Sequence, residues 1–247
     1  ALDFDRLMDS IAAVPEGDAL LLHTVCHNPT GVDPTRGQWQ QLLELVLKRH
    51  LVPIFDFAYQ GFGEGIDADA LPVRQFCESG TGALICNSFS KNFNLYGERV
   101  GGITAVSTTR QSATAMLSQI KRIIRTMYSN PPTHGAAIVA SVLSDPSLRK
   151  VWAEELDEMR LRIQRLRKQF VEAMQERIPD FDFDYVNQQR GMFSYSGISP
   201  EAVDRLKKEH SIYMLKSGRI NVAGINAGNI DRLCDCVASV LRQPVDG

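Results

Sequence analysis

The stretch Ala83-Leu84-Ile85-Cys86-Asn87-Ser88-Phe89-Ser90-Lys91 decides the fold, because it joins an apolar run of strand length to serines and a lysine. Two apolar runs of the same kind precede it, at residues 19–25 and 51–56. Short continuous runs like these are typical of strands that are buried on both faces of a parallel sheet. A helix pattern follows each of the two earlier runs, so the order predicts an α/β sheet with right-handed crossovers.

A fourth run, at residues 102–106, completes the predicted sheet. Its connection from the third strand is too short and too polar for a clear helix, which favours an antiparallel fourth strand. The helices expected around this sheet are, in chain order, residues 4–13, 33–49, 72–77, 109–127 and 134–143. We assign these elements to one large domain, at residues 1–144.

The rest of the chain predicts a long connecting helix and a small α+β domain, at residues 145–247. A helical pattern rich in Arg, Glu and Leu runs from residue 146 to about 177, and Asp145 is suited to cap it. A helix of that length exceeds what one compact domain needs, so we expect it to join two domains. The elements expected beyond it are a strand at residues 181–185, a strand at 192–195, a helix from Pro200, a strand at 220–222 and a closing helix to Leu241.

Composition and charge argue against several classes of function. The chain has 247 residues, of which 44% are hydrophobic and 23% charged, as is typical of a soluble globular protein. Its net charge of −2 does not suggest nucleic acid or an anionic membrane as a partner, and no apolar run approaches the ~20 residues of a membrane span. Five scattered cysteines favour a reduced, cytoplasmic protein over a disulfide scaffold.

Polar side chains follow the predicted strands at the edge where open α/β sheets bind their ligands. They are, in chain order, Asn28, Asp56, Tyr59, Ser88, Ser90 and Lys91. Because the carboxyl ends of parallel strands meet at one edge, we expect these side chains to converge. We predict a ligand site from this convergence, because each residue alone has an ordinary structural explanation.

Lys91 and Arg99 indicate which ligand this edge could bind. A lysine amine can form an imine with an aldehyde, and an arginine together with serine hydroxyls can bind a phosphate. Pyridoxal phosphate carries both groups. The alternatives are a surface lysine and an arginine held in a helix-face or loop ion pair.

Asp56 and Tyr59 could serve the ring of the same cofactor. A carboxylate at the inner end of a buried strand needs a partner, and a pyridinium N–H would make the ring an electron sink. The Tyr59 phenol and the Asn28 amide could donate to the ring oxygen. Alternatively, Asp56 caps a local turn, Tyr59 is a half-buried core residue, and Asn28 begins an ordinary Asn-Pro turn.

Two arginines further along the chain could bind a substrate. Arg219 lies between small residues beside a short strand, where its forked donor could clamp an α-carboxylate. The alternative is a surface arginine on an edge strand. Arg125 lies on a predicted helix with Lys121 and Arg122, so its ordinary explanation is a solvated basic face.

Two other patterns carry no predicted site. His23, His27 and His134 lack the spacing of metal ligands, so we expect them in the core or in loops and predict no metal. The glycines of residues 61–65 loosely match a dinucleotide loop, but no helix opens directly after them. We expect a flexible loop there.

Seven segments together resemble the class I aminotransferases, which are fold type I pyridoxal phosphate enzymes, and in particular the bacterial aspartate and aromatic amino acid aminotransferases. The segments occur in the family's order along the whole chain. They are His27-Asn28-Pro29-Thr30-Gly31, Asp56-Phe57-Ala58-Tyr59-Gln60-Gly61, Ser88-Phe89-Ser90-Lys91-Asn92-Phe93, Tyr96-Gly97-Glu98-Arg99-Val100-Gly101, Tyr128-Ser129-Asn130-Pro131-Pro132, Arg190-Gly191-Met192-Phe193-Ser194 and Ser217-Gly218-Arg219-Ile220-Asn221-Val222-Ala223-Gly224.

The resemblance implies a role for each candidate residue. The cofactor contacts it implies are Asn28, Asp56, Tyr59, Ser88, Ser90, Lys91 and Arg99. Of these, Lys91 would hold the cofactor as an internal aldimine and move the proton, and Asp56 would pair with the pyridine nitrogen. Tyr59 and Asn28 would contact the ring oxygen, and the other three would bind the phosphate. Lys91, Tyr59 and Asp56 are thus the implied catalytic residues.

The resemblance also implies the reaction and the assembly. Arg219 would bind the α-carboxylate of the substrate, and Arg125 would reach the partner subunit's site in a homodimer to meet a dicarboxylate side chain. The implied reaction moves an amino group between an aromatic or acidic L-amino acid and a 2-oxo dicarboxylic acid. The segments at residues 87–91 and 187–195 favour the aromatic branch.

The chain also departs from this family, whose members begin well before the position matched by Ala1. We expect the missing part to carry a phosphate loop, an aromatic residue that stacks on the cofactor ring, and a tyrosine lent across the dimer. The alternative function is therefore a non-catalytic or impaired fragment that keeps the fold and a dimer surface. A β-lyase or decarboxylase on the same fold is a third reading, against which Arg125 argues because it favours dicarboxylates.

Overall fold

The computed structural model describes residues 2–242, which form two compact units. The sheet unit consists of Leu2–Val25 and Pro34–Asp157, and the ribbon unit of Cys26–Asp33 and residues 158–242. Backbone contacts thus change over inside the long helix, between Asp157 and Glu158, whereas the sequence suggested a limit after residue 144. Contacts alone do not define a functional domain, so the predicted limits stay a prediction.

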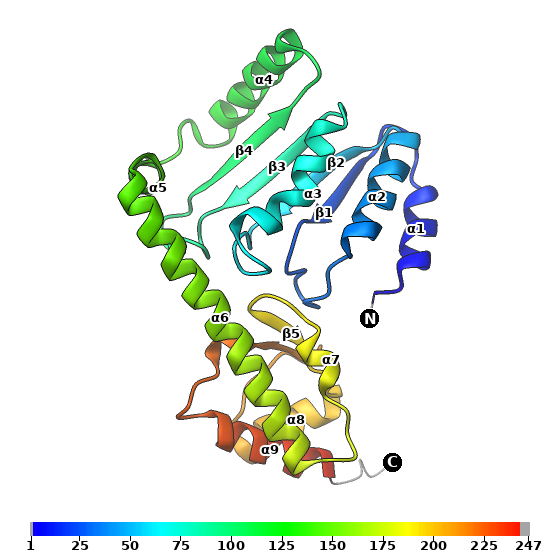
Figure 1. The fold of residues 1–247 in the computed structure, drawn as a ribbon, viewed down its shortest axis with the longest axis vertical. Helices are drawn as coiled ribbons and strands as arrows, with labels where there is room; N and C mark the ends of the chain where they lie inside the picture. Colours follow the sequence, from blue (N-terminus) through cyan, green and yellow to red (C-terminus); the bar gives the residue numbers. More distant parts are fainter. Residues whose placement is uncertain (1, 243–247) are drawn as a thin grey trace. The chain divides into compact units, whose positions relative to one another are not determined.

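The sheet unit is built on four strands in the order β1-β2-β3-β4 (Figure 1). The strands are β1 (Ala19–His23), β2 (Val52–Phe57), β3 (Ala83–Ser88) and β4 (Gly101–Val106). The first three run parallel, and β4 pairs antiparallel with β3. The antiparallel fourth strand confirms the prediction made from its short polar connection.

Helices α1, α2 and α3 lie side by side along this sheet (Figure 1). The helices that begin in the sheet unit are α1 (Phe4–Ala12), α2 (Arg36–Lys48), α3 (Ile66–Glu78), α4 (Arg110–Tyr128), α5 (His134–Ser144) and α6 (Pro146–Arg177). The limits of α6 and its cap were predicted correctly, because Asp145 Oδ1 accepts from the Ser147 and Leu148 amides at 2.8 and 3.1 Å.

Helix α3 begins earlier than expected, at Ile66 rather than near Pro72. The sequence pattern placed the start of this helix at Pro72. In the structure Pro72 lies inside the helix, and Asp67 and Asp69 occupy the first turn. Acidic residues are stabilised at that end by the helix dipole, which explains the earlier start.

An aromatic cluster joins α2, β2 and α3 in the core of the sheet unit. Phe55 and Phe76 are fully buried, and their ring centroids lie 5.0 Å apart at 77°. Trp39 meets Phe76 edge-on, with centroids 6.3 Å apart. Aromatic burial contributes strongly to core stability, so this cluster holds β2 in the position from which it presents its carboxyl end.

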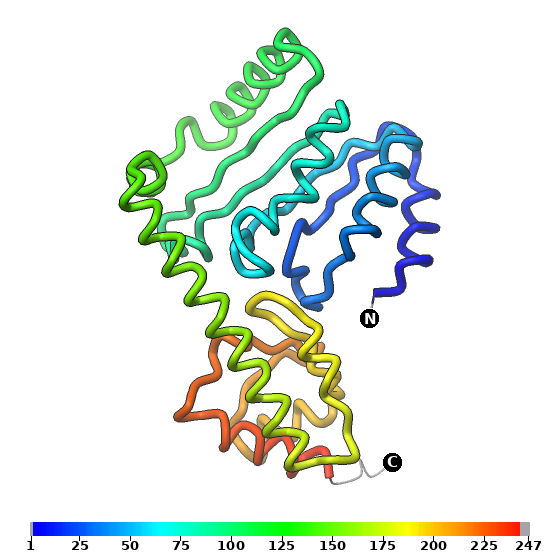
Figure 2. Tube along the Cα trace, in the orientation of Figure 1, coloured from blue at the N-terminus to red at the C-terminus, as the bar shows by residue number. Residues whose placement is uncertain are grey.

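The ribbon unit packs short elements against the second part of α6, and Figure 2 follows its trace to the end of α9. Its other elements are α7 (Asp184–Asn187), β5 (Phe193–Tyr195), α8 (Pro200–His210), β6 (Arg219–Asn221), η1 (Val222–Gly224) and α9 (Ile230–Arg242). Strands β5 and β6 pair antiparallel and form the two-stranded ribbon that gives the unit its name.

The predicted strand at residues 181–185 is wrong. The structure forms the short helix α7 there, because Asp182 Oδ1 accepts from the Asp184 amide at 2.7 Å and turns the backbone. Phe183 is fully buried and meets Phe170 of α6 edge-on, with centroids 6.0 Å apart. The apolar and acidic residues therefore alternate because Phe183 is buried against α6, whereas Asp182 accepts a hydrogen bond that turns the backbone.

Two further findings concern the chain as a whole. No helix among residues 2–242 combines the length and the apolar character needed to cross a membrane. All five cysteines are free thiols.

Replacing Gly61 with alanine is expected to destabilise the sheet unit by about 2–4 kcal/mol. Gly61 has φ +95°, and a Cβ there would lie 2.3 Å from Leu156 Cδ2, so strain and overlap add. Urea unfolding measures the change. Gly37→Ala is the matched control: Gly37 lies in α2 with nothing within 4 Å of its added Cβ. We expect that variant to gain about 0.5–1 kcal/mol, and equal effects of the two changes would contradict the prediction.

Candidate functional site

The carboxyl ends of β1, β2 and β3 meet at one edge of the sheet, where the sequence predicted a site. Asp56 lies on the middle strand of the three, opposite His23 of β1 and Cys86 of β3. The His23 Nε2 atom lies 3.9 Å from Asp56 Oδ2. The Asp56 carboxylate is half-buried, so it remains open to a ligand on one side.

His23 was not predicted to belong to the site, because it was expected in the core or in a loop. Its position opposite Asp56 follows from the parallel register, in which Ala19 pairs with Val52 and each later residue follows in step. Aligning the ends of the two predicted strands was the signal that could have found it. The neighbouring Thr24 is 2% exposed, and its hydroxyl has no hydrogen-bond partner among the described residues.

Tyr59 and Lys91 come together at the same edge. Tyr59 lies just beyond β2 and is 4% exposed, and the Lys91 Nζ atom lies 4.8 Å from the centroid of its ring. An ammonium at that distance over an aromatic face is attracted by the ring quadrupole. The structure thus places the predicted amine beside the predicted phenol, although the two residues are far apart in the sequence.

Asp69 of α3 holds the glycine-containing loop that follows Tyr59. Its buried carboxylate accepts from the amides of Gly61, Gly63 and Glu64 at 2.8, 3.0 and 2.8 Å. Burial raises the pKa of the Asp69 carboxyl, and these donors oppose the rise. A charged acceptor thus holds three backbone amides of the loop at residues 61–65, whose expected flexibility stays a prediction.

Helix α6 holds the segment that carries Lys91 through contacts of Trp152. Trp152 Nε1 donates to the Asn92 carbonyl at 2.8 Å, and its ring stacks on Phe93 with centroids 4.7 Å apart. Asn92 is 5% exposed, and its Oδ1 atom has no partner among the described residues. These contacts limit where the backbone of Lys91 can move.

The predicted phosphate ligands Ser88, Ser90 and Arg99 do not form one bonded group among the described residues. The Ser90 amide donates to Ser88 Oγ at 3.3 Å, and Ser90 is 6% exposed. Arg99 has φ 52° and is exposed, and its Nη1 atom donates to the Tyr96 carbonyl at 2.9 Å. Within the described residues, Arg99 thus binds a carbonyl rather than either serine.

Arg125 stands apart from this group, on the last turn of α4. Its Nη1 atom donates to Ser129 Oγ at 2.7 Å, and the side chain is exposed. No residue of α4 is buried within the sheet unit as described, and Met127 is 71% exposed. The helix therefore presents both a basic and an apolar surface to its surroundings.

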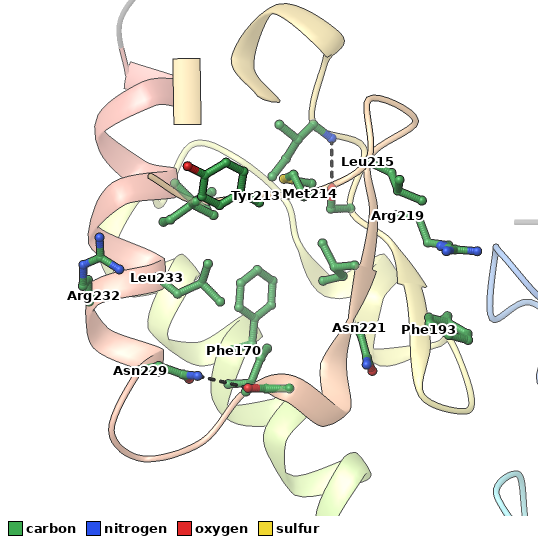
Figure 3. Close-up of a pocket in the computed structure, with 17 residues that line it drawn as sticks. Phe170, Phe193, Tyr213, Met214, Leu215, Arg219, Asn221, Asn229, Arg232 and Leu233 are labelled. Carbon is green, nitrogen blue, oxygen red and sulfur yellow. Dashed lines mark hydrogen bonds between the residues drawn. The ribbon is translucent and has the colours of Figure 1, made fainter. Parts of the chain in front are cut away.

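The remaining two candidates, Asn28 and Arg219, lie in the ribbon unit and contact each other. Arg219 Nη1 donates to Asn28 Oδ1 at 3.1 Å, across 191 positions of sequence. The Arg219 guanidinium carbon lies 4.8 Å from the centroid of the Phe193 ring. Figure 3 shows Arg219 and Phe193 on one side of β6, with Phe170 and Leu233 on the other.

A cavity of about 620 Å³ lies on that other side of β6. Its labelled lining residues in Figure 3 include Phe170, Tyr213, Met214, Leu215 and Leu233. The lining is mainly apolar, whereas Arg219 extends from its margin toward Phe193. Arg219 and Phe193 are also among the residues that line the cavity, so the guanidinium borders it.

Comparison with known proteins decides the family. Residues 1–237 match the family described as aminotransferase class I and II. The chain belongs to this family. It is 50% identical to an aspartate aminotransferase of Haemophilus influenzae over 241 residues, which are 98% of this chain and 61% of that relative. The chain thus spans about three fifths of the curated relative's length.

Solved aminotransferases have the same fold. An aromatic-amino-acid aminotransferase from Burkholderia pseudomallei, covalently bound to pyridoxal phosphate, is 48% identical with a TM-score of 0.95, over 97% of this chain and 60% of that one. An aromatic amino acid aminotransferase with 3-indolepropionic acid is 38% identical with a TM-score of 0.94, over 97% and 62%. The predicted fold type I class is therefore confirmed.

Within this aminotransferase fold, sequence reasoning found the polar residues at the strand ends and missed those that hold them. Asp69 and Trp152 lie on helices and act on loops that precede them in the chain. A buried aspartate near the start of a helix that follows a glycine-containing loop was the available signal. The roles of the individual site residues stay predictions.

Proposed function

We propose that this chain provides the catalytic residues of an aminotransferase that uses pyridoxal phosphate. The reaction moves an amino group between an aromatic or acidic L-amino acid and a 2-oxo dicarboxylic acid. The observation that carries the proposal is the Lys91 amine over the Tyr59 ring, at the sheet edge where Asp56 lies near the end of β2. Family membership independently supports this reaction class.

The chemistry of the residues at this edge fits the cofactor. Lys91 offers an amine for its aldehyde, Asp56 an anion for its pyridine nitrogen, and Tyr59 a phenol for its ring oxygen. Three proposed phosphate ligands, Ser88, Ser90 and Arg99, offer hydroxyls, amides and a guanidinium. When bound, pyridoxal phosphate supplies an electrophilic aldehyde and an electron-withdrawing ring.

Each of the three proposed catalytic residues has a distinct task. Lys91 holds the cofactor at Nζ and later takes and returns the α-proton of the substrate as general base and acid. Asp56 keeps a proton on the ring nitrogen through its negative charge, and His23 lies close enough to orient that carboxylate. The Tyr59 hydroxyl donates a hydrogen bond that stabilises negative charge on the ring oxygen.

The proposed substrate contacts use arginine because its planar fork matches a carboxylate. Arg219 would bind the α-carboxylate, and Asn28 would keep one of its nitrogens in place through the bond to Oδ1 while also donating to the ring oxygen. Arg125 would meet the side-chain carboxylate of a dicarboxylic substrate. Relatives of both the aspartate and the aromatic class align with this chain at similar identity, which supports both substrate classes.

We further propose a homodimer in the cytoplasm. The exposed α4, with Arg125 and the apolar Met127, supports a subunit interface through which Arg125 reaches the partner subunit's site. Five free thiols support a reducing compartment. Sedimentation of the purified protein measures the oligomeric state.

One alternative is that residues 1–247 alone keep the fold but do not catalyse amino transfer. It is suggested because the chain spans 61% of the relative's length. The two functions differ in what happens after the cofactor binds. An impaired fragment would bind pyridoxal phosphate weakly or without reacting, whereas an aminotransferase would pass the amino group onward.

Titration of the purified chain with pyridoxal phosphate tests the proposal. We expect a visible absorption band distinct from that of the free cofactor. Aspartate or cysteine sulfinate should then remove the band in a single half-reaction, and 2-oxoglutarate should restore it. A band that does not respond to either compound would support the impaired alternative, and a protein that gains no band would contradict the proposed function.

A further inference from the structure

Arg167 is a buried cation in the ribbon unit for which the proposed reaction has no direct use. Arg167 lies on α6 and is only 3% exposed. Burial lowers its pKa to about 10, so it is still charged at neutral pH. No carboxylate pairs with Arg167 among the described residues, which is unusual because buried charges are normally paired.

The Arg167 guanidinium binds neutral acceptors at the start of β5. Its Nη2 atom donates to the Gly191 carbonyl at 2.6 Å and to Ser194 Oγ at 3.1 Å, and Nε lies 3.4 Å from the same hydroxyl. Ser194 is fully buried. One forked side chain thus holds both ends of the four-residue segment that carries Phe193.

The alternation of side chains along β5 connects this buried contact to the candidate site. Ser194 points to the core face, so Phe193 and Tyr195 point to the other face. Tyr195 pairs with Arg219 in the ladder, and the Phe193 ring lies 4.8 Å from the Arg219 guanidinium carbon. Arg167 therefore acts on one face of the ribbon, through Ser194, and Arg219 lies on the other face.

The segment that carries Asn28 contacts Gly191, which Arg167 binds, and the neighbouring Arg190. Gly191 approaches Cys26 so closely that an added Cβ would lie 2.5 Å from Cys26 Cβ. The Arg190 amide donates to the Gly31 carbonyl at 2.6 Å. Displacing residues 190–191 would therefore shift Asn28, which is the hydrogen-bond partner of Arg219.

We infer that Arg167 is a positioning residue for the substrate carboxylate: by holding Gly191 and Ser194 from the core side, it sets the place of Phe193, Asn28 and thereby Arg219. This inference rests on the proposed function, in which Arg219 binds the α-carboxylate. A buried charge with neutral partners gives little stability compared with an apolar side chain of similar size. Its forked geometry, however, supplies directional bonds that an apolar residue cannot make.

Arg167→Gln and Ser194→Ala test the inference, with Arg165→Gln as the matched control. Arg165 is an exposed arginine on the same helix. Ser194→Ala removes one acceptor and keeps the bond to Gly191, so it serves if Arg167→Gln does not fold. The first readout is amide hydrogen exchange of residues 191–196, measured by mass spectrometry without substrate.

The second readout compares two ligands that differ only in the carboxylate. Calorimetry of the cofactor-loaded chain measures the affinity for 3-indolepropionic acid and for its amide. In Arg167→Gln we expect faster exchange confined to residues 191–196 and an affinity for the acid lowered by about tenfold to a hundredfold, as for a misplaced binding group. The amide, which Arg219 cannot clamp, should bind as it does to the wild-type chain.

Each other outcome has a definite meaning. Unchanged exchange at residues 191–196 would overturn the inference, and so would faster exchange with unchanged affinity for the acid. Equal losses for the acid and the amide would show a general structural defect and would also overturn it. If the wild-type chain itself did not bind the acid, the proposed function would fail and the carboxylate role of Arg167 with it.

Discussion

Lys91→Ala is expected to lower the rate of amino transfer by up to about 10⁴-fold, because the variant loses its general base and acid. Lys91 Nζ lies over the Tyr59 ring, just beyond the carboxyl end of β2. The visible band of the cofactor-loaded chain should also disappear. Stopped-flow absorbance of the half-reaction with aspartate measures both effects.

Two variants separate loss of the amine from loss of charge or of structure. Lys91→Arg keeps a cation over the aromatic ring but cannot attach to the aldehyde, so we expect it to be as inactive as Lys91→Ala. Lys150→Ala removes an exposed lysine that lies 3.8 Å from Glu154, and it should change neither band nor rate. A Lys91→Ala chain that retains the wild-type band would show that another group holds the cofactor.

Asp56→Asn is expected to slow the half-reaction by about 10²- to 10³-fold while leaving the fold intact. Asparagine has the size of aspartate but no charge, so it cannot keep a proton on the pyridine nitrogen. The backbone contact, in which the Thr24 amide donates to the Asp56 carbonyl at 3.1 Å, is unaffected. Single-turnover kinetics with aspartate and with phenylalanine measure the rate for both substrate classes.

The pattern of rescue decides whether charge is the cause. Asp56→Glu retains the carboxylate at a shifted position, so we expect partial recovery relative to Asp56→Asn. Asp9→Asn on the exposed face of α1 is the control and should behave as the wild-type chain. Equal slowing by Asp56→Asn and Asp56→Glu would indicate that position alone matters, and an unimpaired Asp56→Asn would remove Asp56 from the mechanism.

Local patterns predicted much of the fold. Apolar runs located all four strands of the sheet unit, and the third was placed to the residue at Ala83–Ser88. The Asp145 cap and the charged periodic pattern after it gave both ends of α6. These signals depend on residues close in the sequence, so they can be read without the fold.

The errors occurred where distant contacts outweigh local preference. The pattern around Pro72 suggested a helix start there, but α3 begins at Ile66, and its Asp69 accepts from the Gly63 and Glu64 amides. The alternation at residues 181–185 suggested a strand, but Phe183 is drawn into the core against α6. In both cases tertiary contacts selected one conformation from several that the local sequence allowed.

By itself, the amino-acid sequence determined the positions of the four sheet strands, the polar residues near their ends and the family to which the chain belongs, because each is encoded in short contiguous segments. Only the tertiary structure decided that His23 faces Asp56, that Lys91 lies over Tyr59 and that Arg167 holds the strand beside Arg219. Those pairings join residues separated by many positions, and they arise from register, burial and the need of buried polar groups for partners.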